Sequence, residues 1–235
     1  MTELSIIIPC FNESENLPLL LNRCKEIAAL ENNIEFVIVD NGSTDNTAIV
    51  LDDPANSFGF ITRVKIDVNQ GYGNGILEGL RKASGDIIGW SHADMQTDLA
   101  DSLLALKLFR DSEQPEQLFI KGRRYGRPLS DVFFTIGMSI FETILLRKLM
   151  WDINAQPTMF HKKFFLNWRS PPKDFSLDLY SYFMAKKHKL KILRFPVRFG
   201  QRAYGTSKWN ISFSSKLRFI KRTLSYSFSL QRRMK

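Results

Sequence analysis

Three loops of the sequence combine carboxylates with amide and hydroxyl side chains, and each follows a short apolar run. They read PCFNESENL over 9–17, DNGSTDNT over 40–47 and SHADMQTD over 91–98. In a sheet of parallel strands, ligands bind beyond the carboxyl ends of the strands, where such loops meet. Carboxylate and amide oxygens there can bind the hydroxyl groups of a nucleotide or a divalent cation. The three loops therefore predict a site for a nucleotide and a cation.

Three glycines, Gly71, Gly73 and Gly75, follow the third apolar run in the pattern G-x-G-x-G. The dinucleotide fingerprint G-x-G-x-x-G stands directly after the first strand of its fold, so spacing and position both argue against a dehydrogenase. Glycine lets the backbone approach a ligand closely or lets two elements pack tightly. We expect a turn and a helix entry that border the ligand, with tight packing as an equal alternative.

The elements that must position these loops follow from the apolar pattern. β-Branched runs predict strands over 5–8, 36–39, 64–68, 86–90, 118–121 and 191–195. Three- and four-residue spacing of apolar residues predicts helices over 17–28, 76–82, 132–150 and 177–185. Strands that alternate with helices predict an α/β fold with a mostly parallel, Rossmann-like sheet flanked by helices.

The 235 residues suffice for one domain, which we expect over 1–210. The segment 211–235 predicts a basic amphipathic helix, since its apolar residues share one face and its basic residues lie largely off it. That face holds Phe213, Leu217, Ile220, Leu224 and Phe228. Such a helix binds a membrane surface or packs on its own domain.

Charge divides the chain into two unlike halves. Residues 1–120 hold 8 basic and 19 acidic side chains, whereas residues 121–235 hold 25 basic and 5 acidic ones. A basic half of this kind suits an anionic lipid surface or phosphate-bearing substrates. Nucleic acid is not expected, because the acidic half would repel it and no nucleic-acid motif is present.

Composition sets further limits. Cys10 and Cys24 are the only cysteines, which is too few for a disulfide framework and fits a reducing compartment. The N-terminus has no secretory-signal pattern. The longest apolar stretch, 132–146, contains Glu142 and is expected to be too short to span a bilayer.

Seven segments in order resemble the family-2 inverting glycosyltransferases of GT-A fold, particularly their polyprenyl-phosphate branch, which includes dolichyl-phosphate mannosyltransferases. The segments are SIIIPCFNESENL, VIVDNGSTDNT, NQGYGNGILEGLRKASGDIIGWSHADMQTD, KGRRYGRP, DINAQPTMFH, DFSLDLY and RAYGTSK. The resemblance covers nearly the whole chain and implies a GT-A fold and transfer of a sugar from a nucleotide diphosphate.

The resemblance assigns the donor nucleotide sugar to the loops of the first, second and fourth strands and to the glycine turn. The implied residues are Pro9, Asn12, Glu13, Asp40, Gly42, Ser43, Gly71, Gly73, His92 and Ala93. Asn41 departs from the family pattern, because many relatives carry a second aspartate there. The preferred nucleobase is therefore left open.

The family's metal motif is aspartate, any residue, aspartate, followed two positions later by glutamine. Here it becomes His92, Asp94 and Gln96, so a histidine replaces the first aspartate. The resemblance implies Mg²⁺ or Mn²⁺ on Asp94 and Gln96, with His92 as a weak ligand, a hydrogen-bond donor to the diphosphate, or a mark of reduced metal dependence. The cation would stabilise the departing diphosphate.

The resemblance also implies residues that serve the acceptor and the chemistry. Arg124, Asp178, Ser207 and Lys208 are expected at the acceptor or its phosphate, and Asp94, Asp152 and Arg202 are the expected catalytic residues. A phosphate acceptor is mostly anionic near pH 7 and needs no base, because its second pKa is about 6. A hydroxyl acceptor needs a general base, and Asp152 is the carboxylate expected near the reacting centre.

The sequence thus predicts an inverting glycosyltransferase that acts on a polyprenyl phosphate, peripheral on the cytoplasmic face of an anionic membrane. One alternative is transfer to a hydroxyl of a lipid-linked or surface saccharide. The other is a catalytically silent membrane-binding module of the same fold. The sequence leaves the sugar, the base and the oligomeric state open.

Overall fold

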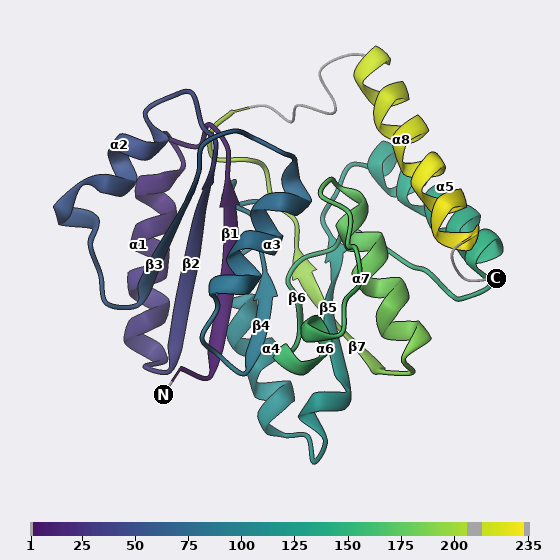
Figure 1. Cartoon of the computed structure of the whole chain (residues 1–235), viewed down its shortest axis with the longest axis horizontal. Helices are drawn as coiled ribbons and strands as arrows, with labels where there is room; N and C mark the ends of the chain where they lie inside the picture. The colour runs from purple at the N-terminus through teal and green to yellow at the C-terminus, as the bar shows by residue number, and fades with distance from the viewer. Residues whose placement is uncertain (1, 206–212, 233–235) are drawn as a thin grey trace.

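The computed structural model describes residues 2–205 and 213–232, with side chains for 2–205 and 220–232. Its centre is a seven-stranded sheet in the order β3-β2-β1-β4-β6-β5-β7 (Figure 1). The strands are β1 Leu4–Cys10, β2 Ile34–Asn41, β3 Ile61–Ile66, β4 Ile87–Trp90, β5 Leu118–Tyr125, β6 Thr158–His161 and β7 Lys191–Arg198.

The sheet confirms the expected mostly parallel arrangement and adds one strand that runs the other way. β1 pairs in parallel with β2 and β4, β2 with β3, and β5 with β7, while β6 is antiparallel to both β4 and β5. The sequence analysis did not predict β6. Its four residues, TMFH, are too few to show an alternating pattern.

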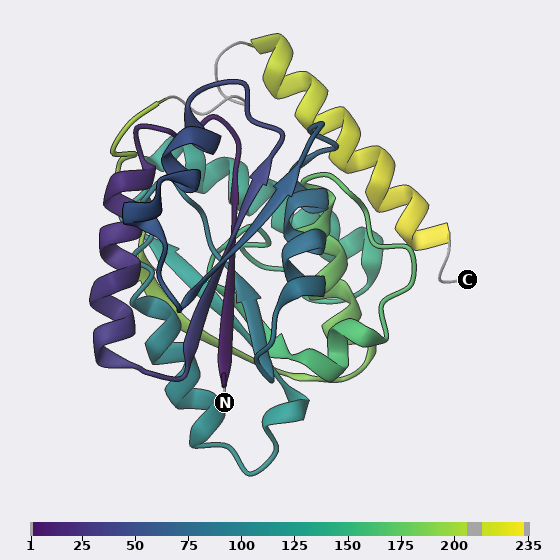
Figure 2. The ribbon, with the colours of Figure 1, turned by 60° about the vertical axis from the view of Figure 1, so that its left-hand side comes forward.

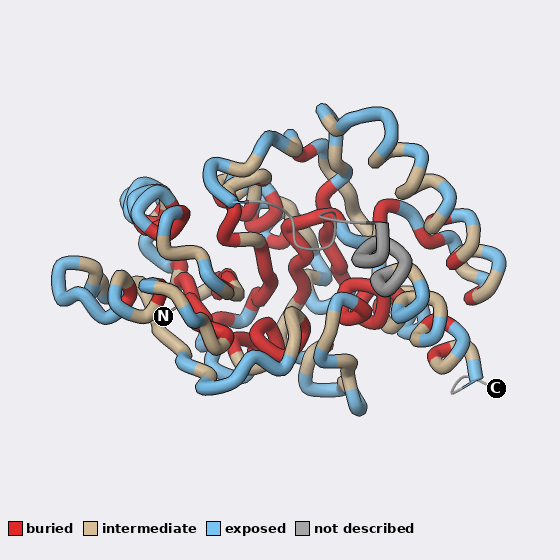
Figure 3. Tube along the Cα trace, turned by 90° about the horizontal axis from the view of Figure 1, so that it is seen from above, coloured by how far each residue is buried: buried red, intermediate tan, exposed pale blue. Residues whose placement is uncertain are grey.

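Helices cover both faces of the sheet. They are α1 Leu17–Leu30, α2 Thr47–Asp52, α3 Tyr72–Lys82, α4 Asp101–Arg110, α5 Leu129–Leu146, α6 Lys162–Leu166, α7 Ser176–Lys187 and α8 Phe213–Arg232, with short 3-10 turns η1 Pro54–Asn56 and η2 Pro115–Gln117. Successive strand residues point to opposite faces. Ile6 and Ile8 therefore pack in one core with α1 and α4, whereas Ile7 packs in the other with α3 and α7. Figure 3 shows the buried residues gathered along the central strands.

Helices α5 and α8 pack on each other at one end of the molecule, far from α1 and α2 (Figures 1 and 2). The Ser227 Oγ donates to Glu142 Oε1 at 2.5 Å, and Gln231 Nε2 donates to the Leu145 carbonyl at 3.1 Å. The rings of Phe141 and Phe228 meet edge to face.

The expectation that the long apolar stretch is too short to span a bilayer was wrong. The helix begins three residues earlier, at Leu129, so α5 has 18 residues. Among the described residues, α5 is one helix that is long and apolar enough to cross a membrane, judged by length and composition. The expected apolar face of α8 stays a prediction: of its described side chains, Ile220 and Leu224 are half-buried and Phe228 is 46% exposed.

Candidate functional site

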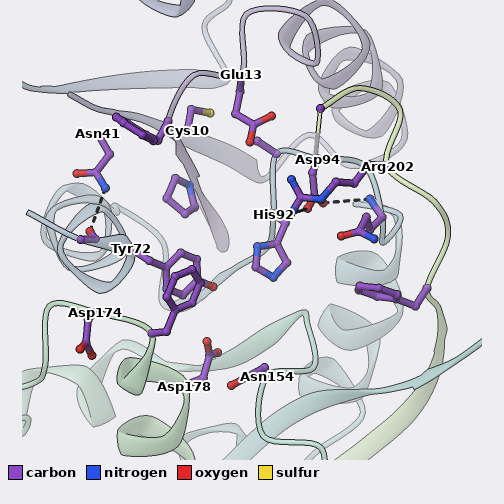
Figure 4. Close-up of a pocket in the computed structure, with 18 of the residues that line it drawn as sticks. Cys10, Glu13, Asn41, Tyr72, His92, Asp94, Asn154, Asp174, Asp178 and Arg202 are labelled. Carbon is purple, nitrogen blue, oxygen red and sulfur yellow. Dashed lines mark hydrogen bonds and ion pairs between the residues drawn. The ribbon is translucent and has the colours of Figure 1, made fainter. Parts of the chain in front are cut away.

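The carboxyl edge of the sheet opens into a cavity of about 950 Å³ (Figure 4). Residues from all three polar loops line it, together with residues of α5, α7 and α8. The predicted site residues that line the cavity are Pro9, Asn12, Glu13, Gly71, His92, Ala93, Asp94, Gln96, Arg124, Asp178 and Arg202. Segments far apart in the chain thus meet at one place, as the sequence analysis expected.

The first two loops are joined through Asn12, whose backbone is left-handed with φ +59°. Its Oδ1 accepts from the backbone N–H of Thr44 at 2.8 Å, and its own N–H donates to Ser43 Oγ at 3.0 Å. Asp40 Oδ1 accepts from the Ser43 N–H at 3.0 Å, which closes the turn through Gly42. Asp40, Gly42 and Ser43 therefore build the turn behind the cavity wall and are not among the residues that line it.

Asn41, rather than Asp40, faces the cavity. Its Nδ2 donates to the Gly71 carbonyl at 2.9 Å and fixes the glycine turn. Gly71 caps α3 with φ +113°, a conformation that glycine adopts without strain. A Cβ at Gly73 would lie 2.6 Å from the Asp174 carbonyl oxygen, so Gly73 serves tight packing and does not line the cavity.

Asp94, the predicted metal ligand, is buried and paired with a guanidinium. Its Oδ2 lies 2.8 Å from Arg202 Nη2, and its Oδ1 accepts from the Gln96 backbone N–H at 3.2 Å. The Gln96 side chain donates to the Gly200 carbonyl at 3.2 Å, and the Gly200 N–H donates back to the Gln96 carbonyl at 2.7 Å. Both predicted ligands are therefore bound to residues 199–205, which we name the strap.

The strap is also fastened to the first loop. Asn16 Oδ1 accepts from the Tyr204 N–H at 3.1 Å, and Asn16 Nδ2 donates to the Tyr204 carbonyl at 3.3 Å. Gly205, with φ +78°, ends the strap. The predicted residues Ser207 and Lys208 lie outside the described residues.

His92 ends a stack of three rings in the cavity. Tyr72 stacks on Phe175 at 4.7 Å between centroids and on His92 at 5.8 Å (Figure 4). Burial lowers the pKa of His92, and the nearby Asp94 only partly opposes this effect, so the ring is neutral at pH 7. The sequence analysis missed Tyr72 and Phe175, because an aromatic residue beside a glycine turn carries no distinct pattern.

A cation at this site would find one carboxylate, one neutral imidazole and the amide of Gln96. Within the described ranges, no group of three His, Cys, Asp or Glu side chains could hold a metal ion by itself. The set fits a divalent cation that takes its other ligands from a diphosphate and water, since Mg²⁺ keeps several waters and Mn²⁺ accepts imidazole. The assignment of Asp94, Gln96 and His92 to a metal stays a prediction.

Asp152 lies behind the cavity wall and clamps an arginine. Its Oδ1 accepts from Arg124 Nε at 2.9 Å, and its Oδ2 accepts from the Arg124 backbone N–H at 3.1 Å. Arg127 Nη2 lies 3.8 Å from the same Oδ1. Burial acts to raise the pKa of the Asp152 carboxyl, but the Arg124 guanidinium outweighs burial and holds that pKa below its usual range. Such a carboxylate is a weak base.

The arginines of this clamp face the cavity. Arg124 and Arg127 both line it, and Arg127 Nη1 donates to Thr135 Oγ1 at 2.8 Å. The Nε atoms of Arg127 and Arg202 are buried and have no hydrogen-bond partner among the described residues. Because an arginine side chain stays protonated in proteins, these N–H donors suit an anionic ligand.

Asp178 lies on the cavity floor below His92 (Figure 4). Its Oδ1 accepts from Trp90 Nε1 and Gln156 Nε2, each at 3.2 Å, and lies 3.9 Å from Lys121 Nζ. Burial raises the pKa of Asp178 and lowers that of Lys121 to about 7. Asp178 thus sits beside a buried lysine that the sequence analysis missed, and its role at an acceptor phosphate stays a prediction.

The sequence of this chain is similar to those of known glycosyltransferases. The family model described as glycosyl transferase family 2 matches residues 5–191. An undecaprenyl-phosphate 4-deoxy-4-formamido-L-arabinose transferase of Proteus mirabilis is 36% identical over 98 residues, which are 41% of this chain and 30% of that protein. Its counterpart from Yersinia enterocolitica is 38% identical over 96 residues, 40% of this chain and 29% of that protein. The matched part thus spans less than a third of these relatives.

Solved structures share the fold at low identity. Glucosyl-3-phosphoglycerate synthase from Mycobacterium tuberculosis, in complex with UDP, superposes with a TM-score of 0.73 at 15% identity over 98% of this chain and 80% of that one. The same enzyme was solved with Mn²⁺, UDP and glucosyl-3-phosphoglycerate. TarS 1–349 from S. aureus superposes with a TM-score of 0.58 at 17% identity over 85% of this chain and 60% of that one. These structures confirm the GT-A fold.

Proposed function

Because the chain belongs to glycosyl transferase family 2, we propose that it moves a sugar, with inversion, from a nucleotide diphosphate to a polyprenyl phosphate. The relatives from Proteus mirabilis and Yersinia enterocolitica are named for transfer involving undecaprenyl phosphate, which supports a lipid phosphate as acceptor. The site would lie at the cytoplasmic face of an anionic membrane, with the protein held peripherally.

The arginine pair at the cavity is the observation that carries this proposal. Arg124 and Arg127 share the carboxylate of Asp152, and Arg127 retains a buried Nε–H that has no hydrogen-bond partner in the described part of the chain. A phosphate group supplies the negative charge and the several acceptor oxygens that this arrangement lacks. The positive charge of the arginine pair and the unpaired Nε–H of Arg127 thus favour a phosphate acceptor over a neutral hydroxyl.

A phosphate acceptor also needs no proton removed before attack. Its oxygen is mostly anionic near pH 7 because its second pKa is about 6. Asp152 is held ionised by two arginines and is buried behind the wall, so it serves the reaction by fixing Arg124. The acceptor oxygen attacks the anomeric carbon while the bond to the nucleoside diphosphate breaks on the opposite face, which inverts the configuration.

On the donor side, Arg202 and the first loop would bind the diphosphate. Arg202 points into the cavity beside Asp94 (Figure 4), and its buried Nε–H has no partner within residues 2–205 and 220–232. A divalent cation held by Asp94, with Gln96 and His92 nearby, would neutralise the developing charge of the leaving diphosphate when bound. The ring of His92, at the end of the stack on Tyr72, offers its other face to a ring of the donor.

The test is transfer of labelled sugar from a panel of UDP-, GDP- and CDP-sugars to undecaprenyl phosphate in detergent. We expect Arg124→Gln and Arg127→Gln each to raise the KM for the lipid phosphate about tenfold or more, as expected for loss of a charge-assisted hydrogen bond. Nucleotide binding, measured by calorimetry, should be unchanged. Arg123→Gln is the matched control, because Arg123 is exposed and does not line the cavity.

Three results would contradict the proposal in different ways. Equal effects of Arg124→Gln and Arg123→Gln would show that the arginine pair does not bind the acceptor. Transfer to a lipid-linked saccharide but not to the lipid phosphate would favour a hydroxyl acceptor with Asp152 as base. Absence of binding to every nucleotide, with or without Mn²⁺, would favour the catalytically silent module.

A further inference from the structure

Helix α5 exposes a continuous apolar stripe. Leu129, Phe133, Ile140 and Ile144 are 75%, 71%, 54% and 74% exposed. Their spacing of four, seven and four residues places them on one face along the whole helix. In a water-soluble domain this face is normally the one that packs into the core.

The opposite side of α5 points inward and carries several polar side chains. Asp131, Thr135, Ser139 and Glu142 all line the cavity, and Ser139 and Glu142 are buried. Thr135 accepts from Arg127, and Ser139 Oγ accepts from the Asp152 backbone N–H at 3.2 Å. The inward side of α5 therefore carries polar side chains together with Phe134 and Met138, which also line the cavity, whereas the outward stripe is apolar. Because the inward side packs on the protein, lipid cannot surround α5 on all sides.

The acidic side chains of the half that contains the stripe are all buried or half-buried. The acidic residues of the half 121–235 are Asp131, Glu142, Asp152, Asp174 and Asp178. None of them is exposed; four line the cavity and Asp152 clamps Arg124. The described outer surface of this half therefore carries no exposed carboxylate side chain.

Basic side chains are exposed on the same part of the molecule. Arg147 follows the end of α5, and Lys221, Arg222 and Arg232 lie on α8, which packs against α5 (Figure 1). Each basic residue near an anionic leaflet adds to binding, while apolar side chains enter the interface. An apolar stripe bordered by cations complements the surface of an anionic bilayer.

We propose that α5 docks its outer face in the interface of an anionic bilayer and lies along the membrane without crossing it. Membrane docking itself does not require the proposed function; its consequence for the acceptor does. The cavity that holds Arg124 lies directly behind α5, whose diameter with side chains is about 10 Å. A polyprenyl chain can therefore stay in the bilayer while its phosphate reaches the arginine pair.

Vesicle co-sedimentation of the full chain tests this placement, with vesicles of phosphatidylcholine alone or with phosphatidylglycerol. We expect binding to the mixed vesicles to weaken with salt. The double variant Phe133→Glu/Ile140→Glu should lower vesicle affinity about 100-fold, because charged side chains are costly at a lipid-facing position. Ile49→Glu is the control: Ile49 is 70% exposed on α2, at the other end of the molecule (Figure 1).

Each other outcome overturns the proposal. If the wild-type chain does not bind the mixed vesicles, or the double variant binds them as tightly as wild type, α5 does not dock. If the double variant turns a dimer into a monomer and leaves vesicle binding unchanged, a second copy covers the stripe. Calorimetry with nucleotides on the same variants separates a failure of docking from a failure of the proposed transfer, since the stripe lies outside the cavity.

Discussion

At the scale of single residues, Arg202 holds the carboxylate that a cation would need. The ion pair between Asp94 Oδ2 and Arg202 Nη2 measures 2.8 Å. His92 stands where the family motif has its first aspartate, so Asp94 is the one carboxylate left in the motif. A cation that binds Asp94 must therefore displace or share this guanidinium. Displaced from Asp94, Arg202 would be available to a diphosphate.

We predict that Arg202→Gln increases the affinity for Mn²⁺ two- to fivefold when no nucleotide is present, because a partly exposed ion pair contributes about 0.2–1 kcal/mol. Free Mn²⁺ measured by electron paramagnetic resonance reports this affinity directly. Arg198→Gln, an exposed arginine on β7, should change nothing. Unchanged or weaker Mn²⁺ binding in Arg202→Gln would show that the two cations do not compete.

At the scale of elements, two glycines in helices have opposite surroundings. A Cβ at Gly73 in α3 would meet the carbonyl oxygens of Asp174 and Pro172 at 2.6 and 2.7 Å, whereas a Cβ at Gly137 in α5 would meet nothing within 4 Å. We predict that Gly73→Ala lowers the free energy of unfolding by about 1–3 kcal/mol through overpacking. Gly137→Ala should raise it by about 0.5–1 kcal/mol through helix propensity. Urea unfolding of both variants checks the contrast; equal effects would contradict it.

The contact between α5 and α8 should depend on pH through Glu142. Burial raises the pKa of its carboxyl from 4.5 to about 7, and the hydrogen bond from Ser227 only partly opposes this. The folded state therefore binds a proton more tightly than the unfolded state, and the cost of the buried charge is full above pH 7 and disappears as pH falls toward 4.5.

We predict that Glu142→Gln raises the free energy of unfolding by about 2 kcal/mol at pH 8 and by little at pH 5. Thermal unfolding at the two pH values measures the difference. Glu78→Gln, a half-buried residue of α3 that pairs with Arg81, is the control that should show no such pH dependence. A gain of equal size at both pH values would mean that the charge of Glu142 is not the cause.

The sequence predicted the parallel strands and the loops at their ends, because buried β-branched runs and polar loops leave local patterns. It did not predict β6, the start of α5 or the stack of Tyr72 on Phe175, since these depend on neighbours distant in the chain. The same reason explains why the sequence predicted a general base at Asp152. Its residue type suits a base, and only the fold shows that Arg124 and Arg127 surround it.

At the scale of the whole molecule, the family match and the cavity lining extend over different parts of the chain. The family match covers residues 5–191, whereas the α5–α8 pair includes residues beyond it. The loops after β1, β2 and β4 line one side of the cavity, where we propose that the nucleotide binds. Helices α5 and α8 line another side, where we propose that the lipid phosphate binds.

The division of charge between the two halves of the chain affects how the molecule is oriented as it approaches a membrane. A net charge of −11 on residues 1–120 and +20 on residues 121–235 gives the molecule an electric dipole along the sheet order. Near a negatively charged leaflet, the field exerts a torque that turns α5 and α8 toward the surface and β2 and β3 away before contact. In the proposed transfer, a water-soluble donor would then enter from the solvent side and the lipid from the membrane side, so the two substrates would not obstruct each other.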